Sequence, residues 1–222
     1  ELSGSLAHEL NQPLAAILSN AQAAQLLLAR DPPQIETVTE ILADIVTSDQ
    51  RAGAVIERLR SMLRKEDMKH ALLDLNHVAE ESLRLMHSDL LNRRVRVDTC
   101  FAQNLPPVSG DQVQLQQVML NLLINGCDAV AGRGREALLH VSSRLTERGS
   151  VAIAISDNGD GIAPQDIERI FEPFVTSKPH GIGLGLAICK GLVEIMDGEI
   201  GVKSAPGQGS VFWFEVPMTR AD

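Results

Sequence analysis

The sequence has no tyrosine, one tryptophan and five phenylalanines among its 222 residues. Positive charge is also scarce, because 20 lysines and arginines face 29 aspartates and glutamates, which leaves a net charge of -9 at pH 7. Proteins that bind nucleic acids usually carry a basic surface and aromatic side chains on which bases stack. The composition therefore argues against a nucleic-acid-binding protein.

Cysteine is rare as well. Cys100, Cys127 and Cys189 are an odd number, lie far apart in the sequence and form no CxxC pair. This pattern predicts neither a disulfide framework nor a zinc site. It fits a protein of a reducing compartment.

Long hydrophobic runs are missing. The longest stretch without a charged residue, 10–29, contains five side-chain amides and one serine, at Asn11, Gln12, Ser19, Asn20, Gln22 and Gln25, so we predict no membrane span there. No basic segment followed by an apolar core opens the chain, and we expect no signal peptide. Because Glu1 rather than a methionine comes first, we interpret the sequence as a piece of a longer protein. We expect this piece to be cytoplasmic, whether or not the longer protein is anchored in a membrane.

Two stripes of apolar residues, 2–28 and 35–63, open the chain and are separated by Asp31, Pro32 and Pro33. Their spacing of three and four residues predicts two amphipathic helices joined by a short turn. A single hairpin leaves its stripe half covered, so we expect two copies to pair as a dimeric four-helix bundle. The alternative is a hairpin that packs on the C-terminal part of its own chain.

A cluster of charged residues at 64–69 ends this periodicity and marks a domain boundary. We predict a helical hairpin at 1–67, a linker at 68–74 and a second domain at 75–222. Within the second domain, capping and alternation patterns predict helices at 77–91 (capped by Asn76), at 112–131 (capped by Asp111) and at 184–196, and strands at 95–101, 138–145, 151–156, 199–204 and 210–216. This order predicts an α+β sandwich of helices on a mixed sheet.

The first chemical motif is HELNQP, residues 8–13. His8 lies two positions from both Leu6 and Leu10, so it faces away from the apolar stripe. A neutral exposed imidazole is a competent nucleophile, and Glu9 is placed to orient it or to take its proton. The alternative is a surface histidine near the bend that Pro13 favours.

The second motif consists of Asn121, Asn125 and Asp128, whose spacings of four and three residues put them on one face of the predicted helix. Buried amides need partners. A carboxamide oxygen can bind Mg²⁺, and a carboxamide NH₂ can meet a phosphate oxygen. The alternative, in which these side chains cap neighbouring loops, stays open.

A third motif, Asp157-Asn-Gly-Asp-Gly161, directly follows a predicted strand. It does not fit a calcium-binding loop, because glycines occupy two ligand positions and Ile162 stands where that loop needs glycine. A carboxylate followed by glycines that let a flat ring approach the backbone suits a nucleobase site.

The fourth motif, Gly181 to Leu186, opens the last predicted helix, where glycines expose N–H groups to phosphates. It matches neither the P-loop nor the dinucleotide-binding pattern and is weak by itself. The irregular segment before it, 171–178, is of the kind that closes over a ligand, and Lys178 is placed to reach a terminal phosphate.

In this order the motifs resemble the transmitter core of bacterial sensor histidine kinases. The segment HELNQPLAAI (8–17) resembles the H box, QVMLNLLINGCDA (117–129) the N box, DNGDGI (157–162) the G1 box, FEPFVTSK (171–178) the F box and GIGLGLAI (181–188) the G2 box. The segment GQGSVF (207–212) resembles the late glycine-rich strand. The resemblance covers nearly the whole chain.

The resemblance implies a dimerisation and phosphoacceptor hairpin followed by an ATP-binding domain of the Bergerat type. ATP and Mg²⁺ would be the cofactors, and a second copy of the chain and the receiver domain of a response regulator the partners. His8 would accept the γ-phosphoryl group with help from Glu9, while Asn125 would bind Mg²⁺. The implied nucleotide site consists of Asn121, Asn125, Asp128, Asp157, Gly159, Gly161, Ile162, Thr176, Lys178, Gly181, Gly183, Leu184, Gly185 and Leu186.

Two positions bear on the activity. Gln12 stands where the family's phosphatase signature has Thr or Asn, so phosphatase activity stays open. The alternative function is that of an ATPase or chaperone-like protein of the same superfamily, which carries a general-base Glu four residues before the Mg²⁺-binding Asn. Asn121 occupies that position here, which favours the kinase.

Overall fold

The computed structural model describes residues 2–30, 34–46, 48–49, 71–131, 136–176, 178 and 183–219, with side chains described from Leu14 onward. The chain divides into two compact units, residues 1–66 and 67–222. Within the described ranges, no helix has the length and apolar character that a membrane span requires.

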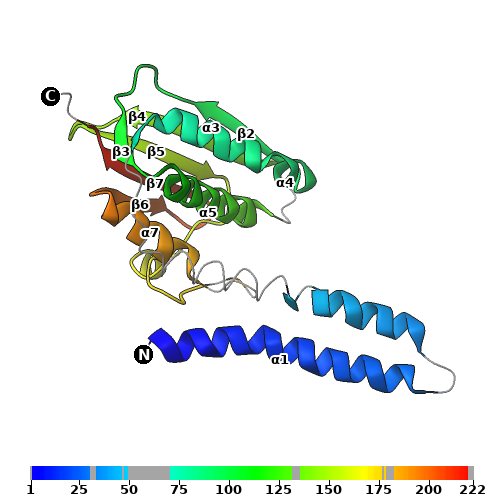
Figure 1. Ribbon diagram of the computed structural model, residues 1–222. Helices are drawn as coiled ribbons and strands as arrows, with labels where there is room; N and C mark the ends of the chain where they lie inside the picture. Colours follow the sequence, from blue (N-terminus) through cyan, green and yellow to red (C-terminus); the bar gives the residue numbers. More distant parts are fainter. Residues whose placement is uncertain are drawn as a thin grey trace. The chain divides into compact units, whose positions relative to one another are not determined.

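The first unit contains helix α1 (Leu2–Leu28) and a second helix whose described part begins at residue 35 (Figure 1). The N–H of Gln34 donates to the carbonyl of Leu27 at 3.3 Å and ties the second helix to the end of the first. Ala24 and Val38 are buried. The two predicted helices are confirmed for 2–28 and 35–46, and the predicted continuation to 63 lies outside the described residues.

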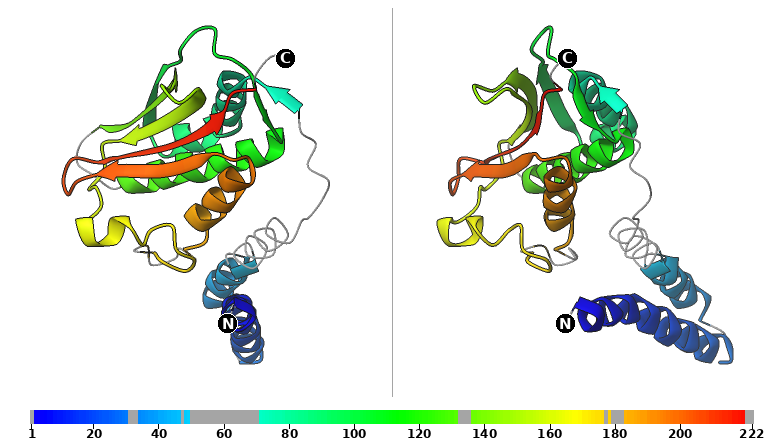
Figure 2. Two further views of the ribbon diagram at one scale, coloured as in Figure 1. Left: turned by 90° about the vertical axis from the view of Figure 1, so that its left-hand side faces the viewer. Right: turned by 60° about the vertical axis from the view of Figure 1, so that its left-hand side comes forward.

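The second unit is built on a five-stranded sheet. Its strands, in spatial order, are β2 (Val95–Cys100), β4 (Ala137–Leu145), β5 (Ser150–Asp157), β7 (Ser210–Pro217) and β6 (Glu199–Ser204). Strands β2 and β4 are parallel and the other neighbours antiparallel. Helices α3 (Leu75–Leu85), α5 (Gln112–Val130) and α7 (Gly185–Ile195) cover one face of this sheet (Figures 1 and 2). The predicted α+β sandwich on a mixed sheet is confirmed.

The core lies between the sheet and the three helices. Alternate residues of the strands point into it, as Val141, Ile153 and Phe214 do, and all three are at most 1% exposed. Helix α5 contributes Leu115 and Leu122 from the other side. This burial of apolar surface fixes α5 on the sheet and so fixes the face that carries its polar side chains.

Helix α5 begins where the sequence predicts. Oδ1 of Asp111 accepts hydrogen bonds from the N–H groups of Val113 at 2.9 Å and Gln114 at 3.1 Å, which satisfies two donors of the first helical turn. The structure corrects the cap of α3. Asp74, not Asn76, caps this helix, because Oδ1 of Asp74 accepts from the N–H of Asn76 at 2.8 Å.

Three further elements differ from the prediction. The predicted helix 77–91 is interrupted at Met86, after which the short helix α4 (His87–Asn92) follows. Strand β1 (Ala71–Leu73) pairs with β3 (Val108–Gly110), so part of the predicted linker 68–74 belongs to the second unit by its hydrogen bonds. Helix α6 (Pro164–Ile167) lies between the third motif and the segment 171–178, where no helix is predicted.

Candidate nucleotide-binding site

The C-terminal part of α5 carries the polar face that the helical spacing predicts, and the side chain of Lys178 contacts this face. The Nζ atom of Lys178 donates to Oδ1 of Asn125 at 2.9 Å and to Oδ2 of Asp128 at 2.7 Å. The two sequence motifs, 53 and 50 residues apart, therefore converge on one ammonium group. Burial alone would raise the pKa of Asp128, but hydrogen bonds from Lys178 and Arg93 outweigh it and hold the pKa below its usual value.

Arg93 is a member of this cluster that the sequence did not indicate. Its Nη1 lies 2.6 Å from Oδ1 of Asp128, and its Nε lies 3.2 Å from Oδ2 of Asp89. The hydrogen bond to Asp128 raises the pKa of Arg93 above its usual value. Arg93 directly follows α4, so this contact ties α4 to α5. No local pattern links two residues that are 35 positions apart.

Asp157 lies at the end of β5, and its side chain is buried with 7% of the residue exposed. Its Oδ1 accepts from the N–H of Gly159 at 2.7 Å and from the N–H of Ser210 at 3.3 Å. These bonds join the G1-like segment to the first residue of β7. The carboxylate is thereby held in one orientation, as a specific acceptor for an exocyclic amine must be.

Two glycines of this segment need to be glycine. A Cβ on Gly159 would lie 2.4 Å from Oδ1 of Asp157 and 2.9 Å from the carbonyl oxygen of Ala129 on α5. Gly161 has φ +71°, and a Cβ there would lie 2.0 Å from the carbonyl oxygen of Ala205. At Gly159 and Gly161 the backbone therefore carries no side chain and packs closely against α5 and the turn that follows β6.

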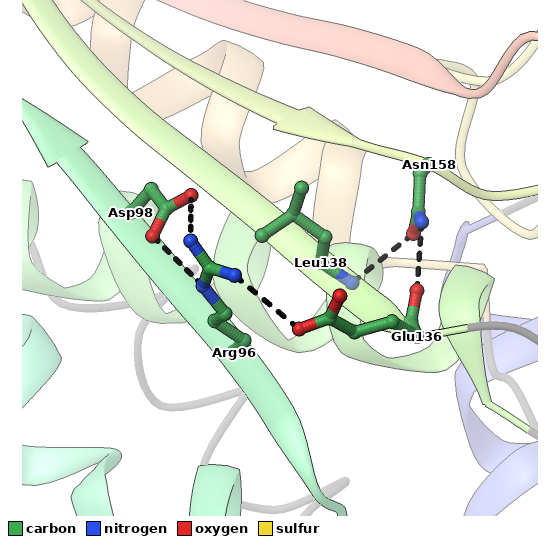
Figure 3. Close-up of polar contacts among 5 residues, drawn as sticks. All are labelled: Arg96, Asp98, Glu136, Leu138 and Asn158. Atoms are coloured by element: carbon green, nitrogen blue, oxygen red, sulfur yellow. Dashed lines mark hydrogen bonds and ion pairs between the residues drawn. The ribbon is translucent and has the colours of Figure 1, made fainter.

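Asn158 fastens the same segment to β4. Figure 3 shows its carboxamide beside the start of that strand, with Oδ1 accepting from the N–H of Leu138 at 3.1 Å and Nδ2 donating to the carbonyl of Glu136 at 2.8 Å. Arg96 reaches the same place from β2 and pairs with Asp98 at 3.1 Å and with Glu136 at 3.4 Å. The side chain of Asn158 thus continues the ladder beyond the end of β5.

The start of α7 lies beside Asn121. A Cβ on Gly185 would be in ordinary contact with the Asn121 side chain at 3.9 Å. Gly183 has φ +70°, and its carbonyl accepts a hydrogen bond from the N–H of Phe174 at 2.9 Å. This bond joins the segment that resembles the F box to the one that resembles the G2 box. Leu184 is 1% exposed, so its side chain belongs to the core.

The remaining predicted site residues have the following places. The N–H of Ile162 donates to Oγ of Ser204 at 2.8 Å, and Oγ1 of Thr176 accepts from the N–H of Lys178 at 3.1 Å. Leu186 is half-buried on α7. Gly181 lies outside the described residues, and the side chains of His8, Glu9 and Gln12 lie outside the described part of α1.

The donor set fits a magnesium nucleotide. One amide oxygen and one carboxylate oxygen of α5 already share a cationic group, so both are oriented toward positive charge. Among the described residues, no group of three or more histidines, cysteines and carboxylates could hold a metal ion by itself. Mg²⁺ is commonly bound by one or two protein oxygens together with substrate phosphates and water. The residues therefore suit Mg²⁺ that arrives with a nucleotide.

Family comparisons assign both units. The phospho-acceptor domain of histidine kinases, HisKA, matches residues 1–68, and the histidine kinase-, DNA gyrase B- and HSP90-like ATPase family matches residues 110–220. This chain belongs to the sensor histidine kinases. Its second unit is the ATP-binding domain of that family, and its first unit is the phospho-acceptor hairpin.

Individual sensor histidine kinases resemble the chain over nearly all of its length. Sensor histidine kinase TmoS of Ectopseudomonas mendocina is 32% identical over 99% of this chain, which spans 23% of TmoS. The crystal structure of full-length ShkA in complex with AMPPNP has a TM-score of 0.70 and 26% identity, covering 98% of this chain and 46% of ShkA. Histidine kinase ThkA in complex with the response regulator protein TrrA shares the fold, with a TM-score of 0.76 at 21% identity, and the match covers 99% of this chain and 61% of that one.

Proposed function

We propose that this chain transfers the γ-phosphoryl group of MgATP to His8 and passes it to an aspartate in the receiver domain of a response regulator. The observation that carries the proposal is the convergence of Asn125, Asp128 and Lys178 on one side of α5. It occurs in a chain whose first 68 residues match the phospho-acceptor family and contain the HELNQP motif.

His8 is the phosphoryl acceptor in this proposal. An exposed imidazole nitrogen attacks without prior deprotonation when it is neutral, and Glu9 receives a hydrogen bond from the ring and keeps the reacting nitrogen in the right orientation. Gln12 follows one helical turn later in the sequence, and we assign to it the positioning of a water molecule for dephosphorylation.

The nucleotide base is assigned to the Asp157 segment. Asp157 accepts a hydrogen bond from the adenine amine, while Gly159, Gly161 and Ile162 provide a backbone surface for the flat ring. Support comes from the burial of Asp157 and from the close approach of Gly159 to α5. A site built to pair one exocyclic amine rejects a base that lacks it, because its buried acceptor is then left unpaired.

The triphosphate is assigned to the α5 face and the start of α7. Asn125 would hold Mg²⁺, with Asn121 and Asp128 beside it on the same face of α5, and Lys178 would reach the terminal phosphate. Gly183, Leu184, Gly185 and Leu186 lie at the N-terminus of α7, where backbone N–H groups would meet the phosphates, and Gly181 is assigned with them from the sequence motif; Thr176 holds the backbone of Lys178. Mg²⁺ supplies charge neutralisation, and the chain supplies in-line placement of the reacting groups.

A homodimer through the hairpin is part of this proposal. Leu14, Leu18 and Leu28 on α1 and Ile35, Leu42 and Val46 on the second helix are large apolar residues between 47% and 61% exposed within the chain. Two hairpins that pair would bury these side chains in a four-helix bundle. We assign the receiver-domain contact to the face of α1 that carries His8 and to residues 11–19; ThkA, which shares the fold, forms a complex with the response regulator protein TrrA.

We assign residues 1–67 to the phosphotransfer hairpin and residues 75–222, together with β1, to the catalytic domain. Phosphoryl transfer requires that these domains dock, so that His8 meets the nucleotide. An ATPase without a phosphohistidine is not favoured, because Asn121 rather than a carboxylate stands one helical turn before Asn125.

Two variants test the division of labour. His8→Ala abolishes phosphorylation of the chain and leaves its affinity for a fluorescent ATP analogue nearly unchanged. Asn125→Ala removes the Mg²⁺ dependence of analogue binding. A large loss of analogue affinity in His8→Ala, or unaltered Mg²⁺-dependent phosphorylation in Asn125→Ala, would refute the assignment.

A further inference from the structure

The amide oxygen assigned to Mg²⁺ is also a hydrogen-bond acceptor for a lysine of the same chain. Lys178 Nζ lies 2.9 Å from Oδ1 of Asn125 and 2.7 Å from Oδ2 of Asp128. Mg²⁺ binds oxygen at about 2.0–2.1 Å. Two cations that share one oxygen at these distances would lie within about 5 Å of each other and repel strongly in a partly buried site.

The two cations on Asp128 are held differently. Arg93 on Oδ1 is fixed by a second carboxylate, Asp89, and sits at the end of α4. The side chain of Lys178 on Oδ2 is as exposed as that of Arg93, 39% against 38%, but among the described residues its ammonium group has one carboxylate, Asp128, and the neutral amide of Asn125 as partners. A long flexible side chain with a compact ammonium group exchanges partners more easily than a forked guanidinium between two carboxylates.

We propose that Lys178 and the divalent cation occupy the Asn125 amide oxygen in turn, while Arg93 stays on Asp128 in both states. Lys178 is thus the resident cation of the site, and entry of the metal releases it for the terminal phosphate. The inference rests on the proposed MgATP site and adds how the negative charge of Asp128 is balanced before the metal enters. It assigns Arg93 as a positioning residue, since it touches neither the nucleotide nor the metal and acts through Asp128.

The exchange can be measured with Mn²⁺ in the presence of saturating ADP, which lacks the terminal phosphate assigned to Lys178 and permits no turnover, from the electron paramagnetic resonance signal of the free ion. Removing the competitor in Lys178→Gln should tighten Mn²⁺ binding roughly 1.5-fold to fivefold, the range expected for a half-exposed ion pair. Arg93→Gln is the charge control, because it removes a cation from the same carboxylate without freeing Asn125. Lys190→Gln, in a surface pair with Glu194 on α7, is the remote control and should change nothing.

The inference is overturned if Lys178→Gln binds Mn²⁺ no more tightly than the unmodified sequence, if Arg93→Gln has the same effect, or if Mn²⁺ binds to neither. A gain in Lys178→Gln that disappears when Asn125→Ala is added supports it. This double-variant comparison places the competition at the shared oxygen.

A second measurement needs no variant. Lys178 is acetylated with a limiting amount of an amine-reactive reagent, and the rate is followed by mass spectrometry. Acetylation should be faster when Mn²⁺ is added to the ADP-bound chain, because the ammonium group leaves Asn125 and Asp128. An unchanged rate at Lys178 overturns the inference. If the unmodified chain still phosphorylates His8 in that case, the exchange is refuted and the proposed function stands.

Discussion

The N–H of Gly159 donates a hydrogen bond to Oδ1 of Asp157 at 2.7 Å, and this bond folds the chain back on itself directly after β5. The same oxygen accepts from the N–H of Ser210, so the loop after β5 and the first residue of β7 both hold this carboxylate. A Cβ on Gly159 would lie 2.4 Å from that oxygen. Residue 159 must therefore be glycine for Asp157 to keep this orientation, which we propose serves to bind the adenine amine.

Asp157→Asn should weaken binding of ATP analogues by roughly tenfold to a hundredfold, because a charged acceptor contributes about 1.5–3 kcal/mol and the new NH₂ group faces donors. Titration with a fluorescent analogue measures the change. Asp98→Asn, on β2 beside Arg96, is the matched control and should bind normally. Equal affinity of Asp157→Asn and the unmodified sequence would contradict the assignment of the base site.

Gly161→Ala and Gly207→Ala form a matched pair, since both glycines have positive φ, +71° and +77°. A Cβ at 161 would lie 2.0 Å from the Ala205 carbonyl oxygen, whereas at 207 nothing lies within 4 Å. Urea unfolding should show a loss of about 1 kcal/mol for Gly207→Ala from backbone strain, and a clearly larger loss for Gly161→Ala. Equal losses would mean that the close approach at Gly161 is relieved at no cost.

Asn158→Ala should lower the free energy of unfolding by about 1–3 kcal/mol, because it leaves the N–H of Leu138 and the carbonyl of Glu136 without their side-chain partner. Hydrogen exchange at Leu138 should become faster in this variant than in the unmodified chain. Arg96→Ala removes only exposed ion pairs and should leave the free energy of unfolding nearly unchanged. Slow exchange at Leu138 in Asn158→Ala would rule out this role for the side chain.

Iodoacetamide at pH 8 should label Cys100 alone in the folded protein. Cys100 is exposed, whereas burial raises the pKa of Cys127 to about 11 and that of Cys189 to about 12. The thiolate is the reacting form, so both buried thiols are inert at this pH. Mass spectrometry should find one adduct on the native chain and three in urea. Rapid labelling of Cys189 in the native chain would contradict its burial between α7 and α5.

The parts of the site that could be predicted from the sequence are those set by local geometry. Asn121, Asn125 and Asp128 share a face because helical spacing places them there, and Asp111 caps their helix as predicted. Arg93 could not be predicted, because its contact with Asp128 depends on how α4 packs against α5. Strand β1 has three residues, too few to show alternation, and Asp74 and Asn76 are both capping types that only the backbone conformation distinguishes.

The central claim is that His8 receives the γ-phosphoryl group. The purified chain and its His8→Gln variant should be incubated with Mg²⁺ and γ-labelled ATP, and the label on the protein tested in acid and in alkali. The account predicts a label that acid removes, that alkali leaves in place and that is missing from His8→Gln. Free phosphate without labelled protein would contradict it and favour an ATPase, and a label that persists in His8→Gln would move the acceptor to another residue.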